Sequence, residues 1–259
     1  MWGVEINAEE KYAYPIRTYA EFEQKGRKSD ERDVDPVAFF NEFIQNLPSD
    51  EALLLQFVVK PALPDWKKHG EEEMKRVQAT LRIYEDGKYT GKAERETEGI
   101  KTRWKAIDDK IGKDGFKTII RYLHIGPKRT FNFFTGYRNF YAFFTQLNHD
   151  YNRFTKNTKV WTKRDWYNFP FIFPNYQVSQ RKEHIYYEYI KRYFTEQTWF
   201  GQLMRSDIIW RRGFSHKITY FNTEELATMF HPPTNIVITT GIMDRIESKR
   251  IAPPSNLPG

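Results

Sequence analysis

The sequence contains no cysteine, and this absence excludes several kinds of protein at once. A disulfide scaffold, a thiolate zinc site, an iron–sulfur cluster and a cysteine nucleophile all need thiols. Long apolar runs are missing as well, because no stretch of the 259 residues approaches the roughly 20 apolar residues of a membrane-spanning helix. The first residues also lack the basic-then-apolar build of a signal peptide. We therefore expect no membrane span in this chain.

Motifs of the common enzyme classes are also missing. The segment 87–92 has glycines and a lysine, but their spacing differs from that of a phosphate-binding loop. None of the six histidines stands four residues from another, and no serine lies in a G-x-S-x-G frame. Asp244, Glu247 and Lys249 faintly resemble the carboxylate–lysine set of metal-dependent nucleases, but they stand too close together. We expect a protein that is not an enzyme, with no catalytic residues, no metal and no cofactor.

Aromatic residues and unevenly distributed charge are the features that stand out. The chain has 21 Phe, 16 Tyr and 7 Trp, which predicts an aromatic core. Residues 1–100 carry 15 basic and 21 acidic side chains, whereas residues 101–220 carry 23 and 9. Such a basic excess attracts nucleic acid or an anionic membrane surface, although it can also serve only to keep a surface solvated.

Hydrophobic periodicity predicts alternating helices and strands. Helices are expected over 36–47, 65–81, 100–111, 131–147, 181–194 and 223–231, and strands over 52–59, 116–125 and 217–221, with a strand or extended segment within 3–19. Asp35 is expected to cap the first helix, and Asn222 and Glu225 should form a capping box at the last one. Residues 84–97 are polar, and a loop is expected over 87–92. This order predicts an α+β fold in which helices cover one face of an antiparallel sheet, with a ferredoxin-like core.

The same pass along the chain predicts three parts. Residues 1–34 are interpreted as an extended N-terminal segment and linker, and 35–231 as the α+β domain. Within this domain, 148–180 lacks a steady period and reads as a long basic and aromatic excursion. Residues 232–259 are rich in proline and are interpreted as a C-terminal linker.

The excursion and the start of the next helix contain candidate nucleic-acid-binding residues. These candidates are Lys156, Lys159, Lys163, Arg164, Trp166, Arg181 and Lys182. Cations can follow phosphates while aromatic faces stack on bases, and neighbouring rings are abundant here. The alternative is that the rings fill the core and the lysine and arginine stems cover them.

Three phrases of the sequence resemble a known family. They are Asp35-Pro36 at a helix start, DWKKHGEE at 65–72, and FNTEELATMFH at 221–231. Together they resemble the region preceding the motor in type IV secretion and conjugation-type ATPases of the HerA/FtsK-like superfamily, as found in candidate phyla radiation bacteria. In that family a similar LNTEELA phrase is followed by a segment like 245–258 and then by the ATPase domain, and Phe221 stands here where Leu is usual.

The resemblance implies a non-catalytic accessory domain that serves assembly and guides a DNA or protein substrate. It also implies a homo-oligomer or a motor ATPase domain as partner, and a cytoplasmic location at the inner face of the inner membrane. A freestanding nucleic-acid-binding module and a metal-dependent nuclease remain as alternatives.

Overall fold

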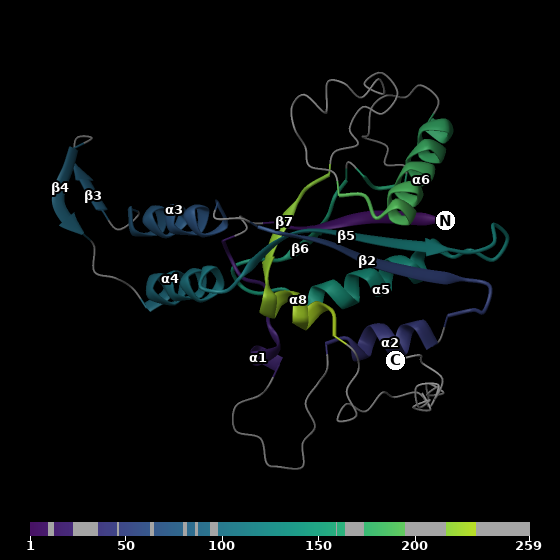
Figure 1. Cartoon of the computed structure of the whole chain (residues 1–259), viewed down its shortest axis with the longest axis horizontal. Coiled ribbons are helices and arrows are strands. Elements are labelled where there is room, and N and C mark those ends of the chain that lie inside the picture. Colours follow the sequence, from purple (N-terminus) through teal and green to yellow (C-terminus); the bar gives the residue numbers. More distant parts are fainter. Residues whose placement is uncertain are drawn as a thin grey trace, which may run out of the picture.

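A computed structural model describes most of the chain (Figure 1). The described residues are 1–9, 13–22, 36–45, 47–62, 65–79, 82–85, 88–93, 98–158, 160–163, 174–194 and 216–231. Asp35, the segment 232–259 and the acidic and lysine residues of the nuclease alternative lie outside this part. None of the described helices is both long enough and apolar enough to cross a membrane.

A five-stranded antiparallel sheet forms the centre of the molecule. Its strands are β1 (Trp2–Ala8), β2 (Ala52–Pro61), β5 (Gly115–Ile125), β6 (Phe154–Lys156) and β7 (Thr219–Asn222). They lie in the order β2-β5-β1-β6, and β7 pairs with the first residues of β5. Because β1 pairs with both β5 and β6, the N-terminal residues belong to the sheet, and the expected boundary at 34/35 does not separate them from the domain.

The helices complete a ferredoxin-like core. The chain passes from β1 through α1 (Tyr19–Phe22) and α2 (Ala38–Gln45) to β2, and from β5 through α5 (Phe133–Gln146) to β6. Helices α2 and α5 lie together on one face of the sheet, where the rings of Phe40 and Phe143 are 5.2 Å apart. The resulting β-α-β-β-α-β order with antiparallel neighbours confirms the predicted α+β fold and ferredoxin-like core.

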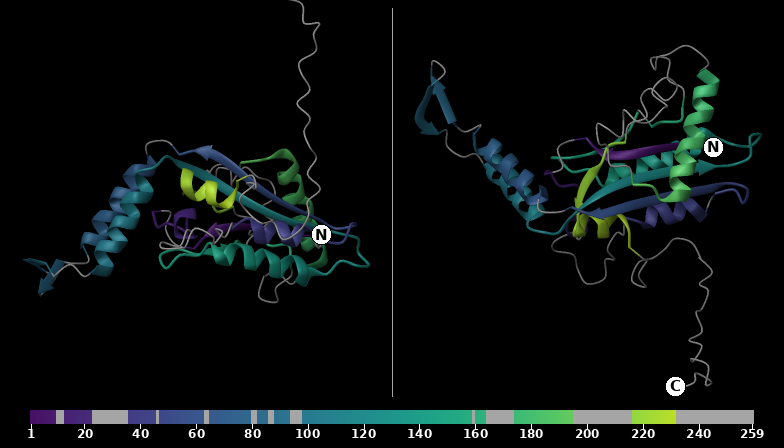
Figure 2. Two further views of the ribbon diagram at one scale, coloured as in Figure 1. Left: turned by 90° about the horizontal axis from the view of Figure 1, so that it is seen from below. Right: turned by 45° about the horizontal axis from the view of Figure 1, so that its top comes forward.

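A long insertion between β2 and β5 departs from that core. It consists of α3 (Asp65–Ala79), β3 (Arg82–Glu85), β4 (Lys88–Ala93) and α4 (Glu98–Ile111), and we call it the arm. Its two helices pair and project away from the sheet with the β3–β4 hairpin at their far end (Figure 2). The expectation of a loop over 87–92 was therefore wrong for most of its residues, because β4 begins at Lys88 and pairs with β3. Apolar periodicity does not reveal strands of this kind.

The arm is fixed to the sheet at its base. Trp66 of α3 stacks on Tyr220 of β7, with ring centroids 5.9 Å apart and an interplanar angle of 7°. Ile107 and Ile111 of α4 are buried in the same cluster, together with Tyr14. These contacts place the start of α3 and the end of α4 against the rest of the domain.

The predicted aromatic core lies between the sheet and α5. The ring of Trp2 makes edge contacts with five other aromatic rings, namely Tyr122, Phe133, Tyr137, Phe140 and Trp161. Alternate residues of β1 and β5 point into this core, as the period of two in a strand requires. All seven residues of β1 are nevertheless buried, which shows that the other face of the strand is covered too.

Helix α6 (Pro174–Lys191) covers that second face (Figure 2). A Cβ atom on Gly3 would lie 2.4 Å from Leu123 Cδ2 and 3.2 Å from Ile185 Cγ2, so glycine permits the close approach of α6 to β1. The expectation of helices on one face only was thus wrong. The excursion over 148–180 is also partly regular, because it contains β6 and the first residues of α6.

The last described helix, α8 (Thr223–Met229), begins as its sequence predicts. The Asn222 side chain accepts from the Glu225 N–H at 2.8 Å, and the Glu225 carboxylate accepts from the Asn222 N–H at 2.9 Å. This confirms the capping box. Glu225 is fully buried and also pairs with Lys110 of α4 at 3.1 Å, while accepting from the Ile16 N–H at 2.9 Å. Burial lowers the pKa of Lys110, and Glu225 opposes this shift.

Candidate functional site: a buried ion-pair ring

Polar side chains form a row across three neighbouring strands on the face covered by α6. The sheet register sets Gln56 of β2 and Glu5 of β1 on either side of Arg121 of β5. Arg121 has no exposed surface and lies 3.0 Å from Glu5 Oε1 through Nε, and its Nη1 donates to Gln56 Oε1 at 3.3 Å. A buried arginine is uncommon unless its charge is paired, so this row is a distinctive feature of the sheet.

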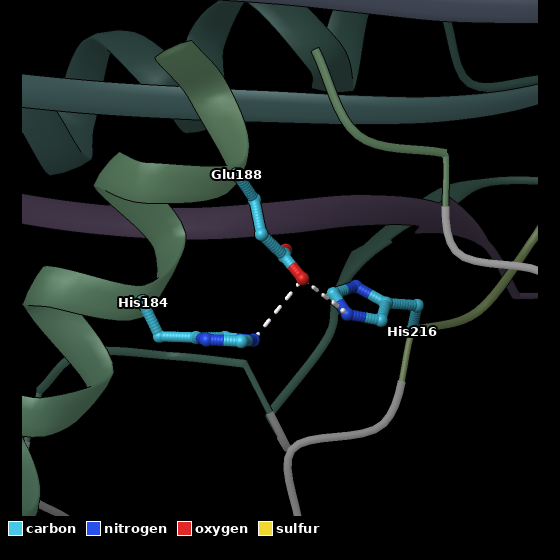
Figure 3. Close-up of side chains that lie close together, drawn as sticks. All are labelled: His184, Glu188 and His216. Carbon is cyan, nitrogen blue, oxygen red and sulfur yellow. Dashed lines mark ion pairs between the residues drawn. The ribbon is translucent and has the colours of Figure 1, made fainter. Parts of the chain in front are cut away.

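Two residues from outside these strands, Glu188 and His216, close the row into a ring, and Figure 3 draws these two together with His184. Glu188 of α6 approaches Arg121 with Oε2 at 3.3 Å from Nη2. His216, just ahead of β7, lies with Nδ1 2.8 Å from Glu5 Oε1 and with Nε2 3.0 Å from Glu188 Oε1. We call Glu5, Arg121, Glu188 and His216 the ion-pair ring. The side chain of each is 2% exposed or less.

Mutual contacts decide the protonation of the ring. Burial disfavours the charged form of His216, but hydrogen bonds to Glu188 and Glu5 and their negative charges outweigh it and raise its pKa to about 9. Burial likewise disfavours the charge of Glu188, but hydrogen bonds from His184 and His216 and the nearby positive charges lower its pKa to about 2. Two carboxylates therefore face two cations, all four with almost no exposed surface, and such pairing is the condition under which buried charges are tolerated.

His184 joins the ring from its outer side. It lies one turn before Glu188 on α6, and its Nε2 is 3.1 Å from the same Glu188 Oε1 that faces His216. Its side chain is 14% exposed, so it lies nearer to solvent than the four ring members do. One ligand atom from each of His184, Glu188 and His216 lies within 4.8 Å of the others, as in a site that could hold a metal ion.

Sequence reasoning missed this site for an identifiable reason. The sequence has no pair of histidines at helical spacing, and its signal is a histidine followed by a glutamate four residues later on the expected helix 181–194. Of the other members, Glu5 comes from β1, Arg121 from β5 and His216 from the segment ahead of β7. Only the strand register and the position of α6 bring them together.

The candidate nucleic-acid-binding residues lie elsewhere. Lys159, Arg164 and Trp166 are outside the described residues. Lys156 lies over the ring of Trp161, with Nζ 3.7 Å from its centroid, and Arg181 Nη1 donates to the Trp161 carbonyl at 3.1 Å.

Trp161 is only 2% exposed and belongs to the aromatic core. Lys156 thus covers a ring of the core, as the alternative expects, whereas Arg181 contacts the backbone of the same residue.

Lys163 and Lys182 lie at other places on the surface. Lys163 Nζ is 4.5 Å from the centroid of Phe133 and 5.9 Å from that of Phe134, a residue that is 59% exposed. Lys182 lies near the N-terminal amine, whose pKa is lowered by burial and by the charge of Lys182. Only the Lys163 neighbourhood therefore combines a candidate cation with a well exposed aromatic ring among these described residues.

Comparison with known proteins gives a family but no function. The model of a domain of unknown function, DUF8128, matches residues 2–146, which is more than half of the chain, and the chain belongs to this family. The matched part holds the ferredoxin-like core up to α5, including Glu5 and Arg121 of the ring. No curated protein and no solved structure matches the chain.

Proposed function

We propose that this chain is a non-catalytic accessory domain of the kind that precedes the motor in type IV secretion and conjugation-type ATPases. In this role it contacts neighbouring subunits and guides a DNA or protein substrate. It acts in the cytoplasm at the inner face of the inner membrane. The resemblance of the sequence phrases supports this proposal, and two features of the structure agree with it.

The first feature is the position of the phrase that carries the resemblance most specifically. The segment 221–231 forms the end of β7 and all of α8. Phe221 is buried in the aromatic core, and Glu225 ties α8 to α4 and to the segment at Ile16. The phrase is therefore an integral part of this domain's fold and not a loose extension.

The second feature carries the proposal, and it is an exposed aromatic stripe on α6. Five large apolar side chains on α6 and just after its end are 42 to 58% exposed, namely Tyr176, Tyr186, Tyr187, Ile190 and Tyr193. We call them the α6 stripe. The opposite side of the helix is buried at Ile185 and Glu188. Exposed apolar clusters mark interaction surfaces, and tyrosine is enriched in interfaces.

A second copy of this chain is the partner that we assign to the α6 stripe. The family that the sequence resembles works as a hexamer, so each copy of an accessory domain has identical neighbours. Tyrosine combines an apolar ring with a polar hydroxyl, which suits a contact that is exposed in the free subunit and covered in the assembly.

Light scattering after size exclusion tests this assignment. We expect a concentration-dependent mass above the 31.2 kDa of one chain. Changing Tyr187 and Ile190 together to Ser should return the mass toward one chain without loss of folding, because both side chains are more than half exposed. Tyr141→Ser on α5, at a ring that is 38% exposed, is the matched control and should leave the mass unchanged. A wild-type mass of one chain at every concentration would contradict the proposal.

Nucleic-acid binding is the second candidate function, and the exposed ring of Phe134 beside Lys163 favours it. Ferredoxin-like RNA-binding domains stack bases on the open face of their sheet. Here α6 and the ion-pair ring cover that face, so the contact would have to use the surface near the start of α5.

A further inference from the structure

We propose that His184, Glu188 and His216 bind a divalent transition-metal ion, with Zn²⁺ as the first candidate. This site is independent of the assembly role and would stabilise the fold. Two imidazole nitrogens and one carboxylate oxygen are the donors that zinc and neighbouring transition metals accept.

The three donor atoms already converge. Glu188 Oε1 lies 3.1 Å from His184 Nε2 and 3.0 Å from His216 Nε2. The three side chains point toward one another from α6 and from the segment ahead of β7 (Figure 3). Ligand atoms around one ion of the zinc type are separated by about 3 to 3.5 Å when each bond is about 2.1 Å long. The two histidine nitrogens lie within 4.8 Å of each other, so binding requires that these two side chains draw closer together.

Glu5 and Arg121 contact the donor residues from behind, as outer-shell residues do in metal sites. Both carboxylate oxygens of Glu5 lie 2.8 Å from His216 Nδ1, which leaves Nε2 to face the other donors. Arg121 contacts the remaining oxygen of Glu188, Oε2, at 3.3 Å. A carboxylate on the far nitrogen of a ligating histidine fixes its tautomer and orientation, and such partners are a regular part of metal sites.

The charge balance also permits a cation at this position. Glu5 and Glu188 supply two negative charges and Arg121 supplies one positive charge. Their sum is one negative charge, so the site favours a cation, and a divalent ion would replace the proton on His216 Nε2. The exposed edge of His184, at 14%, gives the ion a route from solvent.

A zinc titration of the full chain tests whether this site binds a metal ion. The chain is first treated with EDTA and dialysed, and ZnCl₂ is then added at neutral pH in a calorimeter. We expect one Zn²⁺ per chain and a rise in the melting temperature, because an ion that binds only the folded state stabilises it. Co²⁺ should bind in its place and give visible absorption bands of low coordination number.

His184→Ala is the decisive variant because His184 lies outside the ion-pair ring, so that all four ring members remain. It should weaken Zn²⁺ binding by more than about 100-fold, beyond the loss expected for an outer-shell partner. His149→Ala is the matched control, since His149 also lies near a carboxylate, with Nε2 3.5 Å from Glu21 Oε2. It should bind Zn²⁺ as the wild type does. Failure of the folded wild type to bind Zn²⁺, or equal binding by the His184→Ala variant, would overturn the proposal.

Discussion

Arg121 shows at the scale of one residue how the second face of the sheet is stabilised. Its guanidinium contacts Glu5, Glu188 and Gln56, and each of these belongs to a different element. Removing one member of such a group costs more stability than the attraction between its members contributes, because the remaining charge has lost its partner. Breaking a buried pair from one side leaves an uncompensated charge away from water.

We predict that Arg121→Met lowers the free energy of unfolding by about 3 to 5 kcal/mol, because Glu5 and Glu188 then have only His216 as a cation and one buried negative charge is left uncompensated. Urea unfolding at neutral pH measures this difference. Lys101→Met is the control, since the Lys101 side chain is 53% exposed and pairs with Glu98, which is 90% exposed, on the surface of α4. Its effect should stay below about 1 kcal/mol. Equal midpoints for the two variants would show that the ring does not stabilise the fold.

Two glycines in helices give a second pair of predictions, because alanine should stabilise the protein at one position and destabilise it at the other. A Cβ on Gly136 of α5 would lie 2.4 Å from His124 Nδ1, whereas a Cβ on Gly99 of α4 would meet nothing within 4 Å. Alanine favours a helix over glycine by about 1 kcal/mol. Gly99→Ala should therefore stabilise the protein by about 0.5 to 1 kcal/mol.

Gly136→Ala should destabilise the protein by about 1 to 3 kcal/mol despite the better helix propensity, because α5 must move away from β5. Thermal unfolding of both variants checks the pair. A stabilising effect of Gly136→Ala would mean that α5 does not pack as closely on His124 as the structure has it.

Helix α8 illustrates how one element depends on local and on distant contacts. Its start is local, because Asn222 and Glu225 satisfy each other's neighbouring N–H groups. Its attachment is not, because the same Glu225 carboxylate also faces Lys110 and Ile16. The two kinds of contact should differ in how much each contributes to stability.

We predict that Asn222→Ala costs about 1 kcal/mol, the usual loss of an N-cap. Glu225→Ala should cost about 3 to 5 kcal/mol, because the buried ammonium of Lys110 then lacks its carboxylate. Chemical denaturation of both variants gives the comparison. If the two losses were equal, the pairing with Lys110 would add nothing beyond the cap.

The elements also show what the sequence could and could not predict. Strand β5 and the capped start of α8 were predictable because β-branched residues and a capping box are local signals. Strand β6 has three residues, and its partner β1 lies far away in the sequence, so no local pattern marks it. The metal donors were harder still, since only the i, i+4 pair His184 and Glu188 is local and His216 is not.

At the scale of the whole molecule, the excess of positive charge predicts an anionic partner. Residues 101–220 hold most of it, with 23 basic and 9 acidic side chains. We predict weak binding of single-stranded DNA that fades as salt rises, since counterion release drives such binding. Fluorescence anisotropy at several salt concentrations measures it.

Variants locate this contact. Lys163→Glu should weaken DNA binding more than Lys101→Glu on the arm, and Phe134→Ala should weaken it by about 1 to 3 kcal/mol if the exposed ring stacks on a base. Equal effects of the two lysine changes would place the contact away from the start of α5, and the charge would then act only as a general field.

The layout of the molecule followed from the sequence, whereas its surfaces did not. The order of helices and strands indicated an antiparallel sheet with a ferredoxin-like core, which the pairing of the strands confirms. That α6 covers the second face depends on Gly3 and on charges from separate elements, and periodicity carries no such information. The α6 stripe was equally hidden, because tyrosines at helical spacing look the same in sequence whether they are buried or exposed.

Cross-linking from the α6 stripe is the most direct test of the claim that this domain serves assembly. The chain has no cysteine, so a single Ile190→Cys change provides one reactive thiol on a side chain that is 55% exposed. A thiol-specific bifunctional cross-linker should then join copies of the chain efficiently. Lys101→Cys on the arm, where the side chain is 53% exposed, should give only the background of random encounters. Cross-linking from position 190 that does not exceed this background would contradict the proposed assembly.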